Sequence, residues 1–364
     1  MLVGAALASH AAQDAPPRFA PPGDATEDFA VEPLIGNLAG PCGLVLRPGS
    51  PDGEPPELFF SEAAAGRVMR LQLGDELAAM AAVEGFPTRP CDALGGAHVG
   101  PLGLAFLTRT KLAVGEAGLG PGADLVRVYV IDAAAAAYDA VDATVGPITA
   151  GRRPAEGAFF GLALLEDGAL FATALAAESK ETKATKEEGD QDDSPADEAF
   201  LLKATVDANQ VADLQRFVQL SDAGGSHPTA VTLNPNPDAQ YLLVGLQGRA
   251  DDAADSAIAF YSPHSGRQAL TLPCGLRDVV ALAYSPRGQL YAADASWADP
   301  AAGGIYRIDA AMIDGRQACR PVKIAAIVRP VSLAFGGDGN LYAAAWGAAG
   351  ADAAGEIVRI TGAF

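Results

Sequence analysis

The sequence predicts an all-β protein, a six-bladed β-propeller with four-stranded blades. A unit of short apolar strands joined by tight turns recurs six times, with equivalent positions separated by roughly 50 to 70 residues. A period of this length, built only of short strands, is typical of a propeller blade. Glycine (41 residues) and proline (26 residues) are also too plentiful for a long helical bundle.

The first strand of each repeat is a short apolar run that is expected to lie at the centre of the ring. Neighbouring blades cover both faces of such a strand, which explains why its apolar residues are nearly continuous. The strands are expected at 43–48, 103–108, 161–166, 230–235, 281–286 and 332–337. Their equivalent positions are Leu44, Leu104, Leu162, Val231, Leu282 and Leu333.

The second and third strands follow through tight turns rich in Gly, Pro, Asn and Asp, which suit β-hairpins. Second strands are expected at 58–62, 112–116, 170–174, 242–246, 290–294 and 341–345. The third strands alternate apolar residues with one basic residue, while the fourth copy, at 257–261, lacks the base. The basic positions are Arg70, Arg127, Lys203, Arg307 and Arg359.

Fourth strands complete five of the repeats, at 77–85, 138–146, 214–221, 267–273 and 322–328. The sixth repeat has none, because the chain ends after its third strand. Residues 30–38 form an apolar strand without a partner of its own, so this N-terminal strand is expected to close the last blade. Such a closure removes two open sheet edges. Residues 29–364 are therefore predicted to form a single propeller.

Two segments are expected to lie outside the propeller. Residues 1–28 combine an apolar stretch, the triplet Ser9-His10-Ala11 and a Pro-rich run, which is typical of a signal-peptide remnant followed by a disordered leader. This predicts a secreted or periplasmic protein. Residues 178–198 are an acidic insertion with almost no apolar side chains, so they are predicted to be disordered.

The four cysteines leave two interpretations open. Their even number suits two disulfides in an oxidising compartment, with Cys42–Cys91 and Cys274–Cys319 as the pairs closest in sequence. The alternative is four unpaired buried thiols. No CxxC motif is present, so neither a zinc site nor a redox motif of the thioredoxin type is indicated.

The two C-terminal repeats, residues 276–362, resemble NHL-type repeats in their apolar strand, Asp/Ser-x-x-Gly turn, Leu-Tyr strand and basic third strand. Such repeats also resemble the six-bladed gluconolactonase and senescence-marker lactonase class. That class binds a divalent cation through Glu, Asn and Asp at the start of inner strands. None of the matching positions here carries a hard oxygen ligand: Cys42, Leu102, Phe160, Thr229, Val280 and Val331. The resemblance therefore implies the fold without that metal site.

The soluble quinoprotein sugar dehydrogenases share this fold, and a resemblance to them would imply a His base and Arg contacts, for which His98, His227 and Arg329 are the candidates. Glu62, Glu116 and Asp294 share one column at the end of the second strand, so they are the candidate metal ligands. The alternative, which the place of this column in the NHL-type repeat favours, is that they accept hydrogen bonds from loop amides or from the basic residues of the third strands. The candidate ligand-binding residues around the pore are Glu62, His98, Glu116, His227, Asp278, Asp294, Trp297, Arg329 and Trp346.

The charge of −20 argues against nucleic acid as a partner, since phosphates favour a basic surface. No apolar run is long enough to span a membrane. GxSxG and phosphate-binding glycine motifs are absent. The leading hypothesis is an exported, monomeric and non-catalytic propeller that binds a protein or a small polar ligand. The alternative is a metal-assisted hydrolase or lactonase-like enzyme with a carboxylate and histidine site at the pore, whose cofactor would be a divalent cation.

Overall fold

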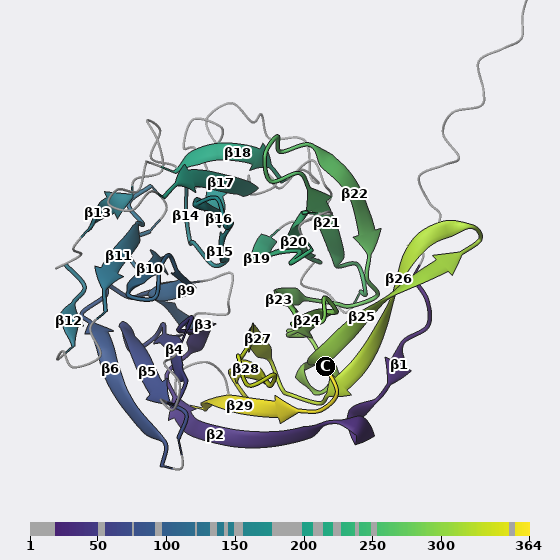
Figure 1. The fold of residues 1–364 in the computed structure, drawn as a ribbon, viewed down its shortest axis with the longest axis horizontal. Helices are drawn as coiled ribbons and strands as arrows, with labels where there is room; N and C mark the ends of the chain where they lie inside the picture. Colours follow the sequence, from purple (N-terminus) through teal and green to yellow (C-terminus); the bar gives the residue numbers. More distant parts are fainter. Residues whose placement is uncertain are drawn as a thin grey trace, which may run out of the picture.

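A computed structural model places six β-sheets in a ring (Figure 1). Its inner strands contact one another in a closed circuit, in the order β3, β9, β15, β19, β23 and β27 and back to β3. The predicted six-bladed propeller is therefore confirmed. The structure describes residues 19–49, 55–74, 76–91, 97–120, 122–131, 137–141, 145–148, 156–176, 199–206, 214–220, 227–236, 240–248, 253–348 and 354–364.

Blades 1 to 3 follow in chain order, each with its first strand nearest the channel. Blade 1 comprises β3 (Pro41–Leu46), β4 (Glu57–Glu62), β5 (Arg67–Gln72) and β6 (Ala78–Glu84). Blade 2 comprises β9 (Pro101–Phe106), β10 (Lys111–Glu116), β11 (Val126–Val130) and β13 (Val145–Ile148). Blade 3 comprises β14 (Glu156–Gly157), β15 (Leu162–Leu164), β16 (Ala169–Ala176), β17 (Ala199–Thr205) and β18 (Gln215–Gln219).

Blades 4 to 6 complete the ring. Blade 4 comprises β19 (His227–Leu233), β20 (Leu242–Gln247), β21 (Ala257–Tyr261) and β22 (Gln268–Pro273). Blade 5 comprises β23 (Val279–Tyr284), β24 (Leu290–Asp294), β25 (Gly304–Ile313), β26 (Arg316–Ala325) and β1 (Gly23–Asp24). Blade 6 comprises β27 (Pro330–Phe335), β28 (Leu341–Ala345), β29 (Gly355–Thr361) and β2 (Ala30–Leu38).

Blade 6 is closed by the N-terminal strand, as the sequence predicts. β2 pairs antiparallel with β29, with Val31 opposite Ile360 and Glu32 opposite Arg359. The ring of Phe29 also packs on the C-terminal Phe364, with centroids 5.1 Å apart. The last blade therefore combines both ends of the propeller, which leaves its third strand without an open edge.

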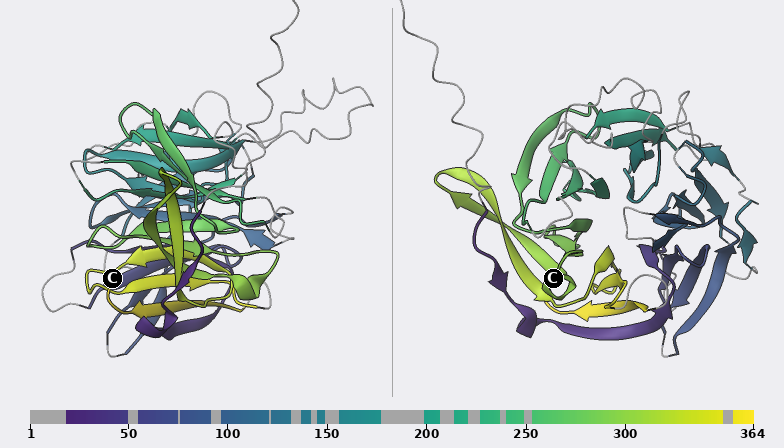
Figure 2. Two further views of the ribbon diagram at one scale, coloured as in Figure 1. Left: turned by 90° about the vertical axis from the view of Figure 1, so that its right-hand side faces the viewer. Right: turned by 180° about the vertical axis from the view of Figure 1, so that it is seen from behind.

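The predicted leader differs from the structure over residues 19–28. These residues lie along the rim of blade 5, where β1 pairs in parallel with β26 (Figure 2). The Ala20 N–H donates to the Cys319 carbonyl at 2.9 Å, and Ala20 is only 4% exposed. An outer strand offers a row of free backbone groups, which is why a Pro-rich segment can order there. Residues 1–18 and the acidic insertion 178–198 lie outside the described residues.

Two outer strands also differ from the prediction. Within 138–146, Tyr138–Asp139 forms the strand β12, which pairs with β6 of blade 1, and the fourth strand of blade 2 is β13 instead. β25 and β26 form a hairpin longer than the repeat requires, and it extends beyond the ring (Figure 1). The repeat pattern is too weak at the rim to predict these pairings.

All four cysteines are free thiols, so the predicted disulfides Cys42–Cys91 and Cys274–Cys319 are not formed. The members of each pair nevertheless lie in or against the same apolar cluster. Burial raises the pKa of the Cys319 thiol to about 11. These side chains therefore act as small apolar residues between blades.

Candidate functional site

One face of the ring carries the loops that lead into the first strands and those that follow the second strands. Backbone hydrogen bonds join the two sets of loops. The N–H of Ala295 donates to the Asp278 carbonyl at 3.0 Å, and that of Trp346 to the Arg329 carbonyl at 3.0 Å. Blades 1 and 2 repeat the bond with Gly40 and Gly100 as acceptors. We call this side of the ring the mouth face.

Glu62 and Glu116 end the second strands of blades 1 and 2, and each is bound to an arginine of its own third strand. The Glu62 carboxylate accepts a hydrogen bond from Arg67 Nε at 2.6 Å and another from the Ala39 N–H at 2.9 Å. Glu116 accepts from Arg127 Nε and is fully buried. Its second oxygen, Oε2, has no hydrogen-bond partner. Glu62 and Glu116 therefore accept hydrogen bonds within their blades, which is the alternative to metal binding given above.

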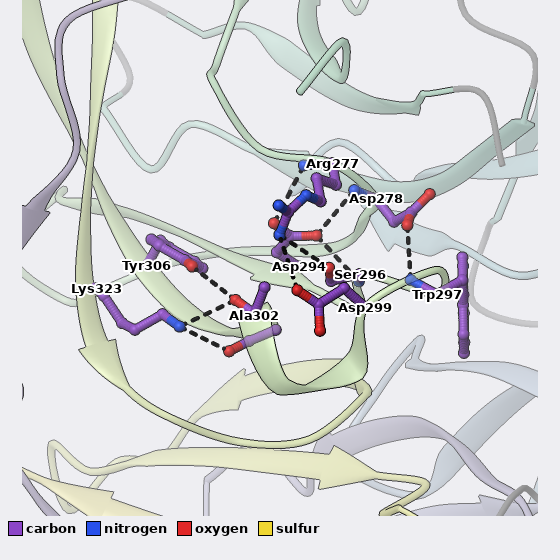
Figure 3. Close-up of polar contacts among 10 residues, drawn as sticks. Arg277, Asp278, Asp294, Ser296, Trp297, Asp299, Ala302, Tyr306 and Lys323 are labelled. Carbon is purple, nitrogen blue, oxygen red and sulfur yellow. Dashed lines mark hydrogen bonds and ion pairs between the residues drawn. The ribbon is translucent and has the colours of Figure 1, made fainter. Parts of the chain in front are cut away.

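Asp294 occupies the same column in blade 5 but binds backbone amides instead of an arginine (Figure 3). Its carboxylate accepts from the N–H groups of Arg277 at 3.1 Å, Asp278 at 2.8 Å and Ser296 at 3.1 Å. Burial raises the pKa of Asp294, and the three amides act against this shift. The side chain therefore holds together the two loops that carry Asp278 and Trp297.

The three candidate metal ligands are not brought together. Glu62, Glu116 and Asp294 belong to three different blades, and each is held by the contacts above. Across the part of the chain that the structure describes, no group of three His, Cys, Asp or Glu side chains could hold a metal ion. A shared divalent cation at these three carboxylates is therefore contradicted by the geometry.

The chain's two tryptophans meet on the mouth face. The ring centroids of Trp297 and Trp346 lie 5.1 Å apart, at an interplanar angle of 50°. Trp346 is buried, and its indole N–H donates to the Pro41 carbonyl of blade 1 at 2.9 Å. Trp297 is half-buried, and its indole Nε1 is buried without a hydrogen-bond partner. The pair therefore covers the junction of blades 5, 6 and 1 and leaves one donor unused.

The Asp278 carboxylate holds the Trp297 loop in place. Its Oδ2 accepts from the Trp297 backbone N–H at 2.8 Å, and its Oδ1 accepts from Gln247 Nε2 at 3.1 Å. Asp278 is fully buried, and burial raises its pKa. The Gln247 contact joins blades 4 and 5. Sequence reasoning missed Gln247, because the fourth repeat has no carboxylate in its column to mark the position.

The basic candidates come from three separate parts of the chain. His98 is exposed on the short strand β8 (Ala97–Val99), which pairs with β7 (Arg89–Cys91). His227 begins β19, and its side chain lies outside the described residues. Arg329 has a left-handed backbone (φ 50°), and its guanidinium donates to the Ala348 carbonyl at 3.4 Å.

A further buried carboxylate, Asp124, was also missed. It lies between the second and third strands of blade 2 and accepts N–H groups from Leu119 at 2.9 Å, Gly120 at 2.8 Å and Ala158 at 3.1 Å. Burial raises its pKa. The bond to Ala158 ties blade 2 to blade 3. Its loop contains no repeat motif, so only the structure reveals this role.

Four buried carboxyl groups have raised pKa values, so the free energy of unfolding is expected to fall as the pH rises. A carboxyl whose pKa is higher in the folded chain than in the unfolded chain favours folding at low pH, and this contribution disappears as the pH rises through the folded value. The loss of stability is expected to begin as the pH rises past the ordinary pKa values, 3.8 for Asp and 4.5 for Glu. The groups concerned are Glu116, Asp124, Asp278 and Asp294.

Denaturant unfolding between pH 4 and pH 8 would measure this slope. Glu116→Gln is expected to make it shallower, because it removes one raised carboxyl and keeps an oxygen for Arg127; one unit of pKa shift corresponds to about 1.4 kcal/mol. Glu32→Gln is the control, because Glu32 is exposed. Stability that rises steadily to pH 8 would contradict the prediction.

The fold and the mouth face define the class of protein: a six-bladed β-propeller whose loop face carries a tryptophan pair at the junction of blades 5, 6 and 1. No protein-family model matches the chain, and no curated protein matches its sequence. A solved structure from Thermus thermophilus, a putative oxidoreductase (glucose dehydrogenase), matches with a TM-score of 0.60 and 18% identity over 92% of this chain and 100% of that chain. A second structure, a glucose dehydrogenase, gives a TM-score of 0.56 and 14% identity over the same shares.

A putative gluconolactonase structure matches at a TM-score of 0.48 and 13% identity, over 91% of each chain. At these identities, the likeness to the two dehydrogenase structures establishes the fold alone. The described residues also include no helix long and apolar enough to cross a membrane.

Proposed function

We propose that this chain is a non-catalytic propeller that binds a ligand or a protein partner on its mouth face. The observation that carries the proposal is the tryptophan pair with its unused indole N–H. A buried donor without an acceptor is costly, so a rearrangement on binding that gives the Trp297 indole N–H an acceptor would stabilise the bound state. The half-buried Trp297 ring, packed at 50° on Trp346, also offers apolar surface, and tryptophan is enriched at binding sites.

The state of the carboxylates supports binding rather than catalysis. A general acid or base must reach the proton that it transfers, within about 3 Å. Glu62 is bound by Arg67, and Asp294 is held by three backbone amides. Asp278 holds the Trp297 loop and Gln247. These groups would have to leave their structural partners before they could act on a substrate.

Intrinsic fluorescence tests the proposal directly. Because the chain has only two tryptophans, the whole indole emission reports on the mouth face. Binding of a ligand from a panel of sugars, lactones, alcohols and short peptides is expected to shift or quench this emission. Trp297→Phe should weaken binding at least about tenfold, since it removes the free donor and part of the stacking surface, each worth about 1 kcal/mol.

Trp346→Phe serves as the comparison, because the Trp346 indole N–H already has Pro41 as its acceptor. Equal affinity of the Trp297→Phe variant and the unmodified protein, measured by calorimetry, would rule out the pair as the binding surface.

The second candidate function is an enzyme of the oxidoreductase or lactonase type. The likeness to two glucose dehydrogenase structures over 92% of this chain favours it. Assays for glucose oxidation with a quinone cofactor, and for lactone hydrolysis with and without divalent cations, would decide. Robust turnover that is lost in Asp278→Asn would replace the binding proposal with this one.

Export is part of the leading proposal. The support is the apolar stretch before Ser9-His10-Ala11, which resembles the end of a signal peptide. N-terminal sequencing of the protein isolated from a producing cell is expected to find a mature chain that starts after Ala11. An intact Met1 in protein from the cell interior would contradict export.

A further inference from the structure

The loop that carries Trp297 joins β24 to β25 through residues 295–303, and we call it the Trp297 loop. Its C-terminal end is anchored by one cation. Lys323 Nζ donates to the Ala302 carbonyl at 3.0 Å and to the Gly303 carbonyl at 2.9 Å (Figure 3). This end of the loop is therefore held by a positive charge on two backbone oxygens.

The N-terminal end of the Trp297 loop is held by two buried carboxylates instead. Asp294 Oδ1 accepts from the Ser296 N–H at 3.1 Å, and Asp278 Oδ2 accepts from the Trp297 N–H at 2.8 Å. The two acids adjoin each other, because the Asp278 N–H donates to Asp294 Oδ1 at 2.8 Å (Figure 3). Both residues are buried. The closed position of the loop therefore depends on the state of two neighbouring acids.

Neither of these carboxylates is bound by a cation in the part of the chain that the structure describes. All of their hydrogen bonds come from neutral donors, namely backbone amides and the Gln247 side chain. Glu62 and Glu116, which end the second strands of blades 1 and 2, each have an arginine. Two adjacent buried carboxyl groups without a countercharge can both be ionised only at a high free-energy cost.

The other ionisable groups around the two acids do not compensate their charge. Asp255 faces Asp278 from the β20–β21 loop, and Asp299 lies on the Trp297 loop itself. The two cations are Arg277, 4.0 Å from Asp299, and Lys323, which already binds the two carbonyls. Burial raises the pKa of both remaining groups, so they stay neutral: Cys274 and Tyr306. Negative charge is therefore in excess once both acids are ionised.

Two further features make the closed loop unfavourable. Ser296 is buried with a left-handed backbone (φ 46°), a conformation that residues other than glycine rarely adopt. The Trp297 indole Nε1 is buried without an acceptor. A loop that opened would relax the Ser296 backbone and bring the indole N–H to water or to a ligand. The contacts of the two acids therefore hold the loop against these costs.

We propose that the Trp297 loop is a pH-controlled lid, closed while the Asp278–Asp294 pair holds a proton and open when both acids are ionised. The lid regulates the proposed binding site, so its purpose rests on that function. In the open loop Asp278 meets water and has its ordinary pKa of 3.8, whereas burial raises its pKa in the closed loop. The closed form therefore binds the proton more tightly, and it is lost as the pH rises through the raised value.

Acrylamide quenching of tryptophan emission tests the lid in the full chain without a ligand. Trp297 is half-buried, whereas Trp346 is buried, so a change in quenching reports chiefly on Trp297. The quenching constant is expected to rise at least about twofold between pH 4 and pH 8, as the lid opens. The far-ultraviolet circular dichroism should stay constant over the same range, because the blades remain folded.

Asp278→Asn should abolish this response and keep quenching at its low-pH value. The amide cannot ionise, yet its oxygen still accepts from the Trp297 N–H, and Gln247 can turn its own oxygen towards the new amide. Gln247→Glu should act in the opposite direction, because it adds a carboxyl group beside Asp278 and raises quenching at pH 8. Glu116→Gln is the matched control: it removes a buried carboxyl group from blade 2 and should keep the full response.

Quenching that does not change with pH would overturn the lid, as would a response that Asp278→Asn leaves intact or one that accompanies a loss of circular dichroism. If Asp278→Asn does not fold, Gln247→Glu decides, and unchanged quenching in that variant overturns the lid.

The ligand panel separates the lid from the proposed function. A ligand of the mouth face should bind more tightly at pH 8 than at pH 4, by up to about tenfold for each unit by which the pKa of the pair is raised. Binding with equal affinity at both pH values, together with constant quenching, removes the lid and leaves the mouth-face proposal standing. A pH-dependent lid with no binding from the panel removes the mouth-face function instead.

Discussion

Replacing Arg127 by alanine is expected to lower the free energy of unfolding by about 3–5 kcal/mol, the usual effect of leaving one member of a buried ion pair alone. Arg127 is the group that binds the fully buried Glu116 carboxylate. The other oxygen, Glu116 Oε2, already has no hydrogen-bond partner. Without the guanidinium, the Glu116 carboxylate would remain buried without an opposite charge.

The loss should depend on pH. Burial already raises the pKa of Glu116, and the positive charge of Arg127 acts against that shift. In Arg127→Ala the pKa of Glu116 rises further, so Glu116 takes up a proton at mildly acidic pH. Part of the lost free energy of unfolding then returns. The variant should therefore be most destabilised at alkaline pH and least at low pH. Denaturant unfolding at several pH values measures both effects.

Arg359→Ala is the matched control. Arg359 is also a third-strand arginine bound to a glutamate, Glu32, but this pair is exposed. Exposed pairs contribute about 0–1 kcal/mol. Adding Glu116→Gln to Arg127→Ala should restore part of the loss, since it removes the unpaired charge. If Arg127→Ala and Arg359→Ala cost the same, the buried pair does not have the importance that we assign to it.

A chain that begins at Ala39, and so lacks β2, is expected not to fold as a stable monomer. β2 supplies the outer strand of blade 6, and Leu38 at its end is 4% exposed. Its removal opens the edge of β29 and takes away the Phe29 contact with Phe364. The loss would be comparable to the whole stability of a typical domain, about 5–15 kcal/mol.

The control is a chain that begins at Phe29, which keeps β2 and loses β1 together with the rest of residues 19–28. It should melt cooperatively, close to the temperature of a chain that begins at Phe19. Size-exclusion chromatography and thermal unfolding distinguish the three chains. A chain from Ala39 that is monomeric and melts at the full-length temperature would show that the closure is dispensable.

The architecture was predictable because propeller blades repeat themselves. The positions taken as equivalent on the first strands indeed lie opposite the second strands in matching register, as in Leu44 opposite Phe60 and Leu333 opposite Ala343. The closing strand was predictable for a related reason, since the last repeat lacked one strand and residues 30–38 had no partner. Both inferences need only local hydrophobic patterns and a count of strands.

The pairings at the rim were not predictable in the same way. β1 and β12 are two-residue strands that pair with β26 and β6, and neither has a strand-like pattern of its own. They are ordered by the open edge of a strand that lies far away in the sequence. The roles of Asp124 and Gln247 were not predictable for a similar reason, because their partners Ala158 and Asp278 belong to the next blade.

The sequence by itself determined the ring, the number of blades and the column of carboxylates at the ends of the second strands. Only the tertiary structure decided what that column does. The buried Glu116 carboxylate is bound by an arginine, whereas the Asp294 carboxylate accepts hydrogen bonds from three backbone amides. A repeat sets where a residue lies along its blade, but the role of a buried charge depends on which groups surround it in space, because desolvation must be compensated by neighbours at contact distance.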